Sequence, residues 1–79
     1  MPEAEIYRAL EDIFRDVFVR DDLELAPEMT AKDVAGWDSF KQIEIIVAVE
    51  ARYSIKFNTR ELDSLQSVGD LVKTIAGKL

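Results

Sequence analysis

The sequence predicts an all-α protein, a small four-helix bundle with three longer helices, one short third helix and a long loop between the first two helices. Apolar residues recur at helical spacing in three separate segments. Only one short segment alternates as a strand does, and no second strand is available to pair with it. With 79 residues, the chain is expected to form a single domain over residues 1–79 with a small core.

The first predicted helix covers residues 3–18. Its apolar residues lie three or four positions apart: Ile6, Leu10, Ile13, Phe14, Val17 and Phe18. Glu3 and Glu5 fall in the first turn, where the helix dipole favours acidic groups. Residues 19–37 lack a sustained period and contain Pro27 and Gly36. We therefore expect a long connection with room for one short turn of helix, and a loop of this length is typical of a functional segment.

The most apolar segment runs from Ser39 to about Tyr53 and predicts the central helix. Its apolar positions are Phe40, Ile43, Ile45, Ile46, Val47 and Val49, a stripe wide enough to be covered on more than one side. After this helix, Ile55 and Phe57 alternate with polar residues. We interpret this stretch as an extended loop that inserts apolar side chains into the bundle.

Two capping signals open the C-terminal helices. Asn58 followed by Glu61 predicts a capping box at the start of a short helix. Ser67 followed by Asp70 repeats the signal more weakly before the last helix. The buried face of the last helix is expected to consist of Val68, Leu71, Val72 and Ile75. Gly77 is the expected terminator of that helix.

The composition excludes several classes of function. The chain has no cysteine, so it has no thiol or thiolate metal site of its own, and it has no histidine, the usual general base. A Ser-His hydrolase is therefore excluded, and we expect no metal site. The net charge of −6, of which residues 1–39 carry −7 and residues 40–79 carry +1, argues against nucleic acid and anionic membranes as partners. Partners with basic patches are favoured.

The N-terminal segment MPEAEIYRAL has neither the basic nor the apolar region of a signal peptide. No apolar run approaches the roughly 20 residues that a membrane span requires. We therefore expect a cytoplasmic protein without stable membrane insertion. The polar, acidic surface leads us to expect a monomer.

The chain contains two Asp-Ser pairs, Asp38-Ser39 and Asp63-Ser64. Either pair could be a helix cap without any further role. At the first pair, either Ser39 is the N-cap with Gln42 at the capping-box position, or Asp38 is the N-cap and Ser39 lies in the first turn. In both arrangements the Ser39 hydroxyl lies near free N–H groups and the positive end of the helix dipole, which favour a phosphate. Ser64 falls inside or at the end of a short helix, and we interpret its pair as surface.

Two stretches between about Leu23 and Ile75 carry a family pattern: APEMTAKDVAGWDSFKQIEIIVAVEARYSIKF, with Gly-Trp before the Asp-Ser pair and an apolar helix after it, and SVGDLVKTI. This segment resembles acyl carrier proteins, and SVGDLVKTI is similar to the last helix of that family. The resemblance implies a bundle of acyl-carrier type in which Ser39 accepts a 4′-phosphopantetheine arm from coenzyme A. It also implies that Asp38 helps the phosphopantetheinyl transferase and its metal ion to engage.

As implied by the resemblance, the chain would hold an acyl group as a thioester on that arm and present it to enzymes of fatty-acid, polyketide or related specialised acyl biosynthesis. The resemblance thus implies a carrier and not an enzyme. The implied partners are the phosphopantetheinyl transferase and the acyl-loading and acyl-transfer enzymes. We assign partner recognition to residues near the serine: Trp37, Phe40, Ile43, Glu44 and Val47. The alternative for Trp37 is that it packs at the helix entry. The alternative for Phe40, Ile43 and Val47 is a place in the core.

Lys41 and Arg52 stand where acids are frequent in that family, which favours a dedicated set of partners. Two other functions remain open. The first is a free-standing aminoacyl or peptidyl carrier of a nonribosomal pathway, which would share Ser39 and the arm. The second is a small helical protein-interaction module without a prosthetic group, in which Ser39 is only a cap.

Overall fold

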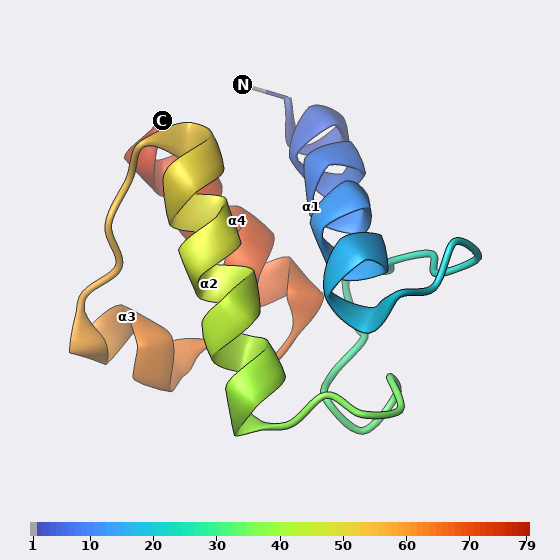
Figure 1. Ribbon diagram of the computed structural model, residues 1–79. Coiled ribbons are helices and arrows are strands. Elements are labelled where there is room, and N and C mark those ends of the chain that lie inside the picture. Colours follow the sequence, from blue (N-terminus) through green and yellow to red (C-terminus); the bar gives the residue numbers. More distant parts are fainter. Residues whose placement is uncertain (1) are drawn as a thin grey trace.

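The computed structural model describes residues 2–79, which form four helices and no strand (Figure 1). In chain order these are α1 (Glu3–Phe18), α2 (Ser39–Tyr53), α3 (Thr59–Ser64) and α4 (Val68–Lys78). The predicted four-helix class, with its short third helix and its long loop between α1 and α2, is confirmed. None of these helices in residues 2–79 combines the length and the apolar character that crossing a membrane requires.

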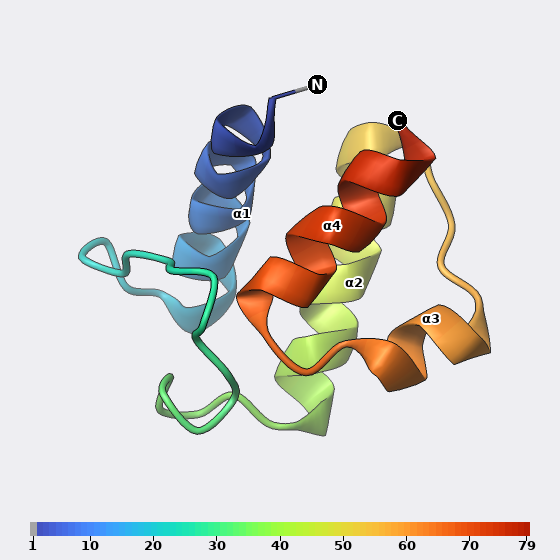
Figure 2. The same ribbon diagram turned by 180° about the vertical axis from the view of Figure 1, so that it is seen from behind.

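The core lies between α1, α2 and α4, whereas α3 lies on the side of α2 and α4 that faces away from α1 (Figure 1 and Figure 2). The largest fully buried side chains include Phe14, Ile6, Leu10, Ile45 and Ile75. No residue of Thr59–Ser64 is buried. Full burial of one such side chain stabilises a fold by about 1.5–3 kcal/mol, so the three long helices supply most of the stability.

α1 has the predicted bounds. Four of its predicted apolar positions are buried, namely Ile6, Leu10, Ile13 and Phe14, and Val17 and Phe18 are half-buried against the core. The helix ends at Val19, which adopts a left-handed conformation with φ 53°. This conformation is unusual for a β-branched residue.

The loop over residues 19–38 joins the core and supports the start of α4. Two of its side chains are buried, Leu23 and Val34. The carbonyl of Met29 accepts a hydrogen bond from the N–H of Val68, and the carbonyl of Pro27 accepts one from the N–H of Gly69, both at 2.9 Å. The loop thereby satisfies N–H groups that have no partner inside α4. It contains turns but no helix, so the expected short helical turn does not form.

α2 has its predicted bounds, but its apolar stripe is only partly covered. Three of its residues are buried: Ile45, Ile46 and Val49. Three others are exposed: Phe40 at 78%, Ile43 at 61% and Val47 at 58%. The expectation that the central helix is covered on more than one side is therefore wrong. The exposed residues point away from the core that α2 shares with α1 and α4, and nothing within residues 2–79 covers them.

The segment after α2 follows the predicted pattern. Ile55 and Phe57 are half-buried against the core, as expected for an extended loop that inserts apolar side chains. The predicted capping box is present: the Asn58 side chain accepts the N–H of Glu61 at 2.8 Å, and Glu61 Oε1 accepts the N–H of Asn58 at 2.9 Å. This reciprocal pair explains why so short a helix begins at Thr59.

α4 begins at its predicted cap, where Ser67 Oγ accepts the N–H of Asp70 at 3.2 Å. Its buried residues are the four that were predicted: Val68, Leu71, Val72 and Ile75. The prediction that Gly77 ends the helix is wrong, because α4 continues to Lys78. An ion pair of 2.8 Å between Lys78 Nζ and Glu61 Oε1 holds this last turn against α3.

Candidate functional site

Asp38 and Ser39 form the start of α2. Asp38 is the N-cap, and its Oδ1 accepts the N–H of Lys41 at 3.0 Å. Ser39 is the first residue of the helix, and its side chain is exposed. Of the two capping arrangements that the sequence left open, the structure has the one with Asp38 as N-cap.

The N–H groups of Ser39 and Phe40 make no hydrogen bond within residues 2–79. They lie at the positive end of the dipole of the 15-residue helix α2. A phosphate ester on Ser39 would receive hydrogen bonds from these free groups without displacing the Asp38 cap. The first turn of α2 contains no acidic residue. The residues present therefore fit a phosphodiester on Ser39.

Gly36 and Trp37 bring the long loop onto the bundle just before this site. Gly36 has φ 86°, a conformation that glycine adopts without steric cost. The Trp37 ring packs edge-on against Phe14 with 5.1 Å between centroids, and its centroid lies 6.3 Å from that of Phe18. Its Nε1 donates a hydrogen bond to Gln42 Oε1 at 2.7 Å. These contacts favour the alternative in which Trp37 packs at the helix entry.

A stripe of exposed apolar side chains follows Ser39 along α2. Phe40, Ile43 and Val47 are all more than half exposed, and their spacing of three and four residues places them on one face of the helix. They are therefore not part of the core. Together with the exposed Glu44, they form what we call the α2 surface. An exposed apolar patch with a polar border is typical of a contact surface.

Two other charged residues of α2 are engaged within the fold. Lys41 Nζ donates a hydrogen bond to the carbonyl of Val17 at 3.2 Å and lies 3.7 Å from the Glu44 carboxylate. Glu50 Oε2 accepts the N–H of Phe57 at 2.9 Å. Lys41 thus ties α2 to the end of α1, and Glu50 orders the loop after α2.

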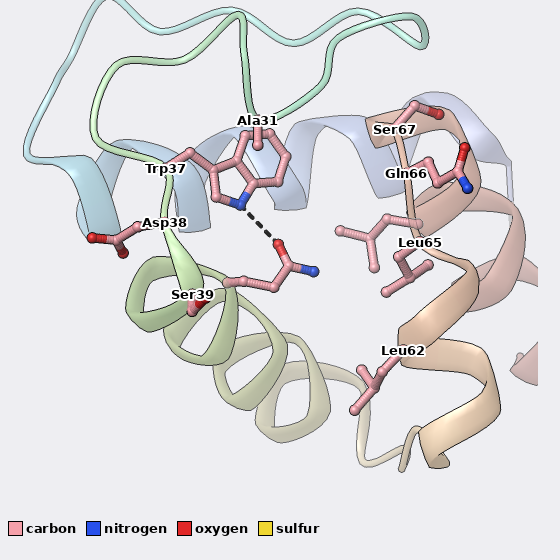
Figure 3. Close-up of a pocket in the computed structure, with 10 residues that line it drawn as sticks. Ala31, Trp37, Asp38, Ser39, Leu62, Leu65, Gln66 and Ser67 are labelled. Carbon is pink, nitrogen blue, oxygen red and sulfur yellow. Dashed lines mark hydrogen bonds between the residues drawn. The ribbon is translucent and has the colours of Figure 1, made fainter.

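An open groove of about 450 Å³ lies beside Ser39 (Figure 3). Ser39 and Trp37 lie on one side of it, and Leu62 and Leu65 lie opposite them, on α3 and just after it. Polar side chains also line the groove, namely Gln42, Gln66 and Ser67. The groove therefore begins at the exposed serine and offers both apolar and hydrogen-bonding groups.

Ser64 has a different environment. It is the last residue of the six-residue helix α3, it is exposed, and its Oγ donates to the carbonyl of Glu61 at 2.8 Å. The C-terminal end of a helix is the negative end of its dipole and disfavours a phosphate. Asp63 and Ser64 are both exposed, as expected for a pair at the surface, and Ser39 remains the predicted attachment site.

The sequence did not predict two interactions near the groove, namely the hydrogen bond between Trp37 and Gln42 and the ion pair between Glu61 and Lys78. It indicated Gln42 only as a possible capping partner and Glu61 only as part of a capping box. The hydrogen bond from Lys78, followed by that from the N–H of Asn58, lowers the pKa of Glu61 below its usual value. The sequence signal for Gln42 was its place three residues after Ser39, on the same face of α2.

Comparison with known proteins identifies a family with this arrangement. Residues 8–75 match the family model described as the phosphopantetheine attachment site. The meromycolate extension acyl carrier protein of Mycolicibacterium aurum is 33% identical over 73 residues, which cover 92% of this chain and 75% of that protein. The acyl carrier protein of Acidothermus cellulolyticus is 29% identical over 76 residues, which cover 96% of this chain and 90% of that protein.

The fold is similar to a solved structure as well. The solution structure of a holo acyl carrier protein from Geobacter metallireducens superimposes with a TM-score of 0.86 and is 42% identical. The match covers 91% of this chain and 83% of that chain. Sequence and fold therefore lead to the same family.

Proposed function

We propose that Ser39 bears the covalent 4′-phosphopantetheine group of this chain, which belongs to the acyl carrier protein family. Proteins of this family are carriers and not catalysts. The observation that supports Ser39 is its position: it is the exposed first residue of α2, beside N–H groups that have no partner within residues 2–79. Ser64 lies at the opposite, negative end of a short helix.

In the proposed attachment, a bond forms between Ser39 Oγ and a phosphorus atom of coenzyme A. The P–O bond of the diphosphate breaks, 3′,5′-ADP leaves, and the hydroxyl proton passes to the transferase. The N–H groups of Ser39 and Phe40 would hold the phosphodiester oxygens of the attached group. Asp38 uses only Oδ1 in its cap, so Oδ2 remains available to the metal ion of the transferase. When bound, the group supplies the thiol that this chain lacks, on which an acyl cargo is held as a thioester.

The chain functions in fatty-acid or related acyl biosynthesis. The named relatives are acyl carriers, and one of them is a meromycolate extension carrier. We propose an acyl cargo for this chain rather than the aminoacyl cargo of the alternative hypothesis. The covalent group of the family also argues against an interaction module without a prosthetic group.

The partners of the chain are the phosphopantetheinyl transferase and acyl-processing enzymes. We propose that these enzymes contact the α2 surface of Phe40, Ile43, Glu44 and Val47, with Trp37 beside it. The exposure of three apolar side chains next to Ser39 supports this assignment. We further propose that residues 1–79 act as a single monomeric domain in the cytoplasm and that nucleic acid is not a partner.

The intact mass of the protein after incubation with coenzyme A and a broad-specificity phosphopantetheinyl transferase tests the site. We expect the wild type and Ser64→Ala to gain one phosphopantetheinyl group and Ser39→Ala to gain none. Circular dichroism of Ser39→Ala shows whether that variant retains its helices. A folded Ser39→Ala that still gains the group would overturn the assignment.

A further inference from the structure

The side-chain amide of Gln42 has a fixed orientation beside the groove. The indole Nε1–H of Trp37 is a donor only, so the atom of Gln42 that it meets at 2.7 Å must be the acceptor, Oε1. Nε2 therefore points away from the indole. The dashed line in Figure 3 marks this hydrogen bond at the edge of the groove.

The Nε2 group of Gln42 is an unused donor. Within residues 2–79, the hydrogen bond that Oε1 accepts from Trp37 is the one hydrogen bond of the Gln42 side chain, and Gln42 lines the groove that starts at Ser39. Gln42 follows Ser39 by three residues, so the two side chains lie on the same face of α2, about one helical turn apart. A chain attached to Ser39 Oγ that enters the groove passes this donor first.

The opposite side of the groove is apolar. Leu62 and Leu65 face Ser39 and Trp37 across it (Figure 3). A ligand that suits the groove combines a hydrogen-bond acceptor with apolar groups close to its attached end. The phosphopantetheine arm has this chemistry, because its geminal methyl groups lie next to the phosphodiester and its first amide carbonyl follows them.

We infer that Gln42 Nε2 donates a hydrogen bond to an amide carbonyl of the arm and so holds the arm along the groove against Leu62 and Leu65. The inference rests on the proposed attachment to Ser39. Trp37 is a positioning residue here, because it orients the amide before the arm arrives and so reduces the entropy that the contact costs. One net hydrogen bond shifts the ratio of groove-bound to free arm by about threefold to tenfold.

Nuclear magnetic resonance of the protein with and without the attached group tests the inference. In the wild type we expect cross-relaxation between methyl protons of the arm and those of Leu62 and Leu65, and a shift of the Gln42 side-chain amide resonance when the group is attached. Gln42→Glu keeps an oxygen for the Trp37 indole but removes the donor. It should lower the groove-bound fraction, with a ratio of bound to free arm reduced about threefold to tenfold.

Gln66→Glu is the matched control, because it adds the same negative charge at another residue of the groove. We expect this variant to retain the wild-type contacts. An arm that contacts neither leucine in the modified wild type, or an equal loss in both variants, would overturn the inference while leaving the attachment site intact. Absence of any mass gain on the wild type would instead overturn the proposed attachment, and the inference with it.

Discussion

The side chain of Lys41 in α2 donates a hydrogen bond from Nζ to the main-chain carbonyl of Val17 in α1, at 3.2 Å. Val17 lies in the last turn of α1, where carbonyl groups lack partners inside the helix and the dipole favours a cation. This contact gives Lys41 a structural role. It fixes the helix that begins with Ser39 against the end of α1.

Lys41→Met keeps most of the side-chain stem and removes the donor. We expect the free energy of unfolding to fall by about 1 kcal/mol, measured by urea titration with the fluorescence of Trp37 as the signal. Lys56→Met is the control, because Lys56 is exposed and should change stability by less than about 0.5 kcal/mol. Equal losses in the two variants would contradict a specific role for Lys41.

Ile43 and Ile45 lie in the same helix but differ in burial, with exposed fractions of 61% and 0%. We expect Ile45→Ala to lower the free energy of unfolding by about 2–5 kcal/mol, because it leaves a cavity in the core. Ile43→Ala should change it by less than about 0.5 kcal/mol. If the α2 surface is a partner contact, Ile43→Ala slows acyl loading despite its normal stability, and a normal loading rate would remove Ile43 from that surface.

Gly69 and Gly77 of α4 provide a second matched pair. A Cβ on Gly69 would lie 3.0 Å from the carbonyl oxygen of Pro27, whereas a Cβ on Gly77 would meet nothing within 4 Å. We expect Gly69→Ala to lower the midpoint of thermal unfolding, with a cost of about 1–3 kcal/mol from overpacking. Gly77→Ala should raise the midpoint, because alanine is favoured over glycine in a helix by about 1 kcal/mol. A higher midpoint of thermal unfolding in both variants would show that the loop around Pro27 moves to make room for the added methyl group at little cost.

Asp38 combines a cap with a negative charge, and two variants separate these roles. Asp38→Asn keeps the capping oxygen, so we expect nearly wild-type stability, whereas Asp38→Ala should lose about 1 kcal/mol in chemical denaturation. If the carboxylate assists the transferase, both variants are modified more slowly at Ser39, as followed by mass spectrometry over time. A wild-type rate in Asp38→Asn would show that only the cap matters.

The Glu61–Lys78 ion pair makes the anchoring of α3 depend on pH. The hydrogen bond from Lys78 lowers the pKa of Glu61 in the folded state. The ionised Glu61 side chain therefore contributes to the free energy of unfolding above the unfolded pKa of about 4.3. This contribution is lost as the pH falls through the lower folded pKa. Glu61→Gln keeps the capping geometry without the charge. We expect the difference in unfolding free energy between wild type and Glu61→Gln to shrink between pH 7 and pH 3, and a constant difference would contradict this role.

The sequence by itself determined the features that depend on neighbouring residues. The bounds of α1 and α2, the reciprocal cap of Asn58 and Glu61, and the place of Ser39 at a helix start all follow from spacings of three or four residues. Such interactions form within one helical turn, so the order of residues is enough to predict them. The resemblance around Asp38-Ser39 then indicated the family.

Only the tertiary structure decided which side of α2 is covered. Apolar residues surround much of this helix, so periodicity alone could not separate Ile45 in the core from the exposed Phe40 and Ile43. The contact of Lys41 with Val17, and the hydrogen bond that orients Gln42 beside Trp37, likewise depend on how α1 and the long loop pack against α2. Burial of apolar side chains in the shared core of α1, α2 and α4 sets the positions of these elements and so brings the contacting groups together. The same packing leaves one apolar face of α2 open.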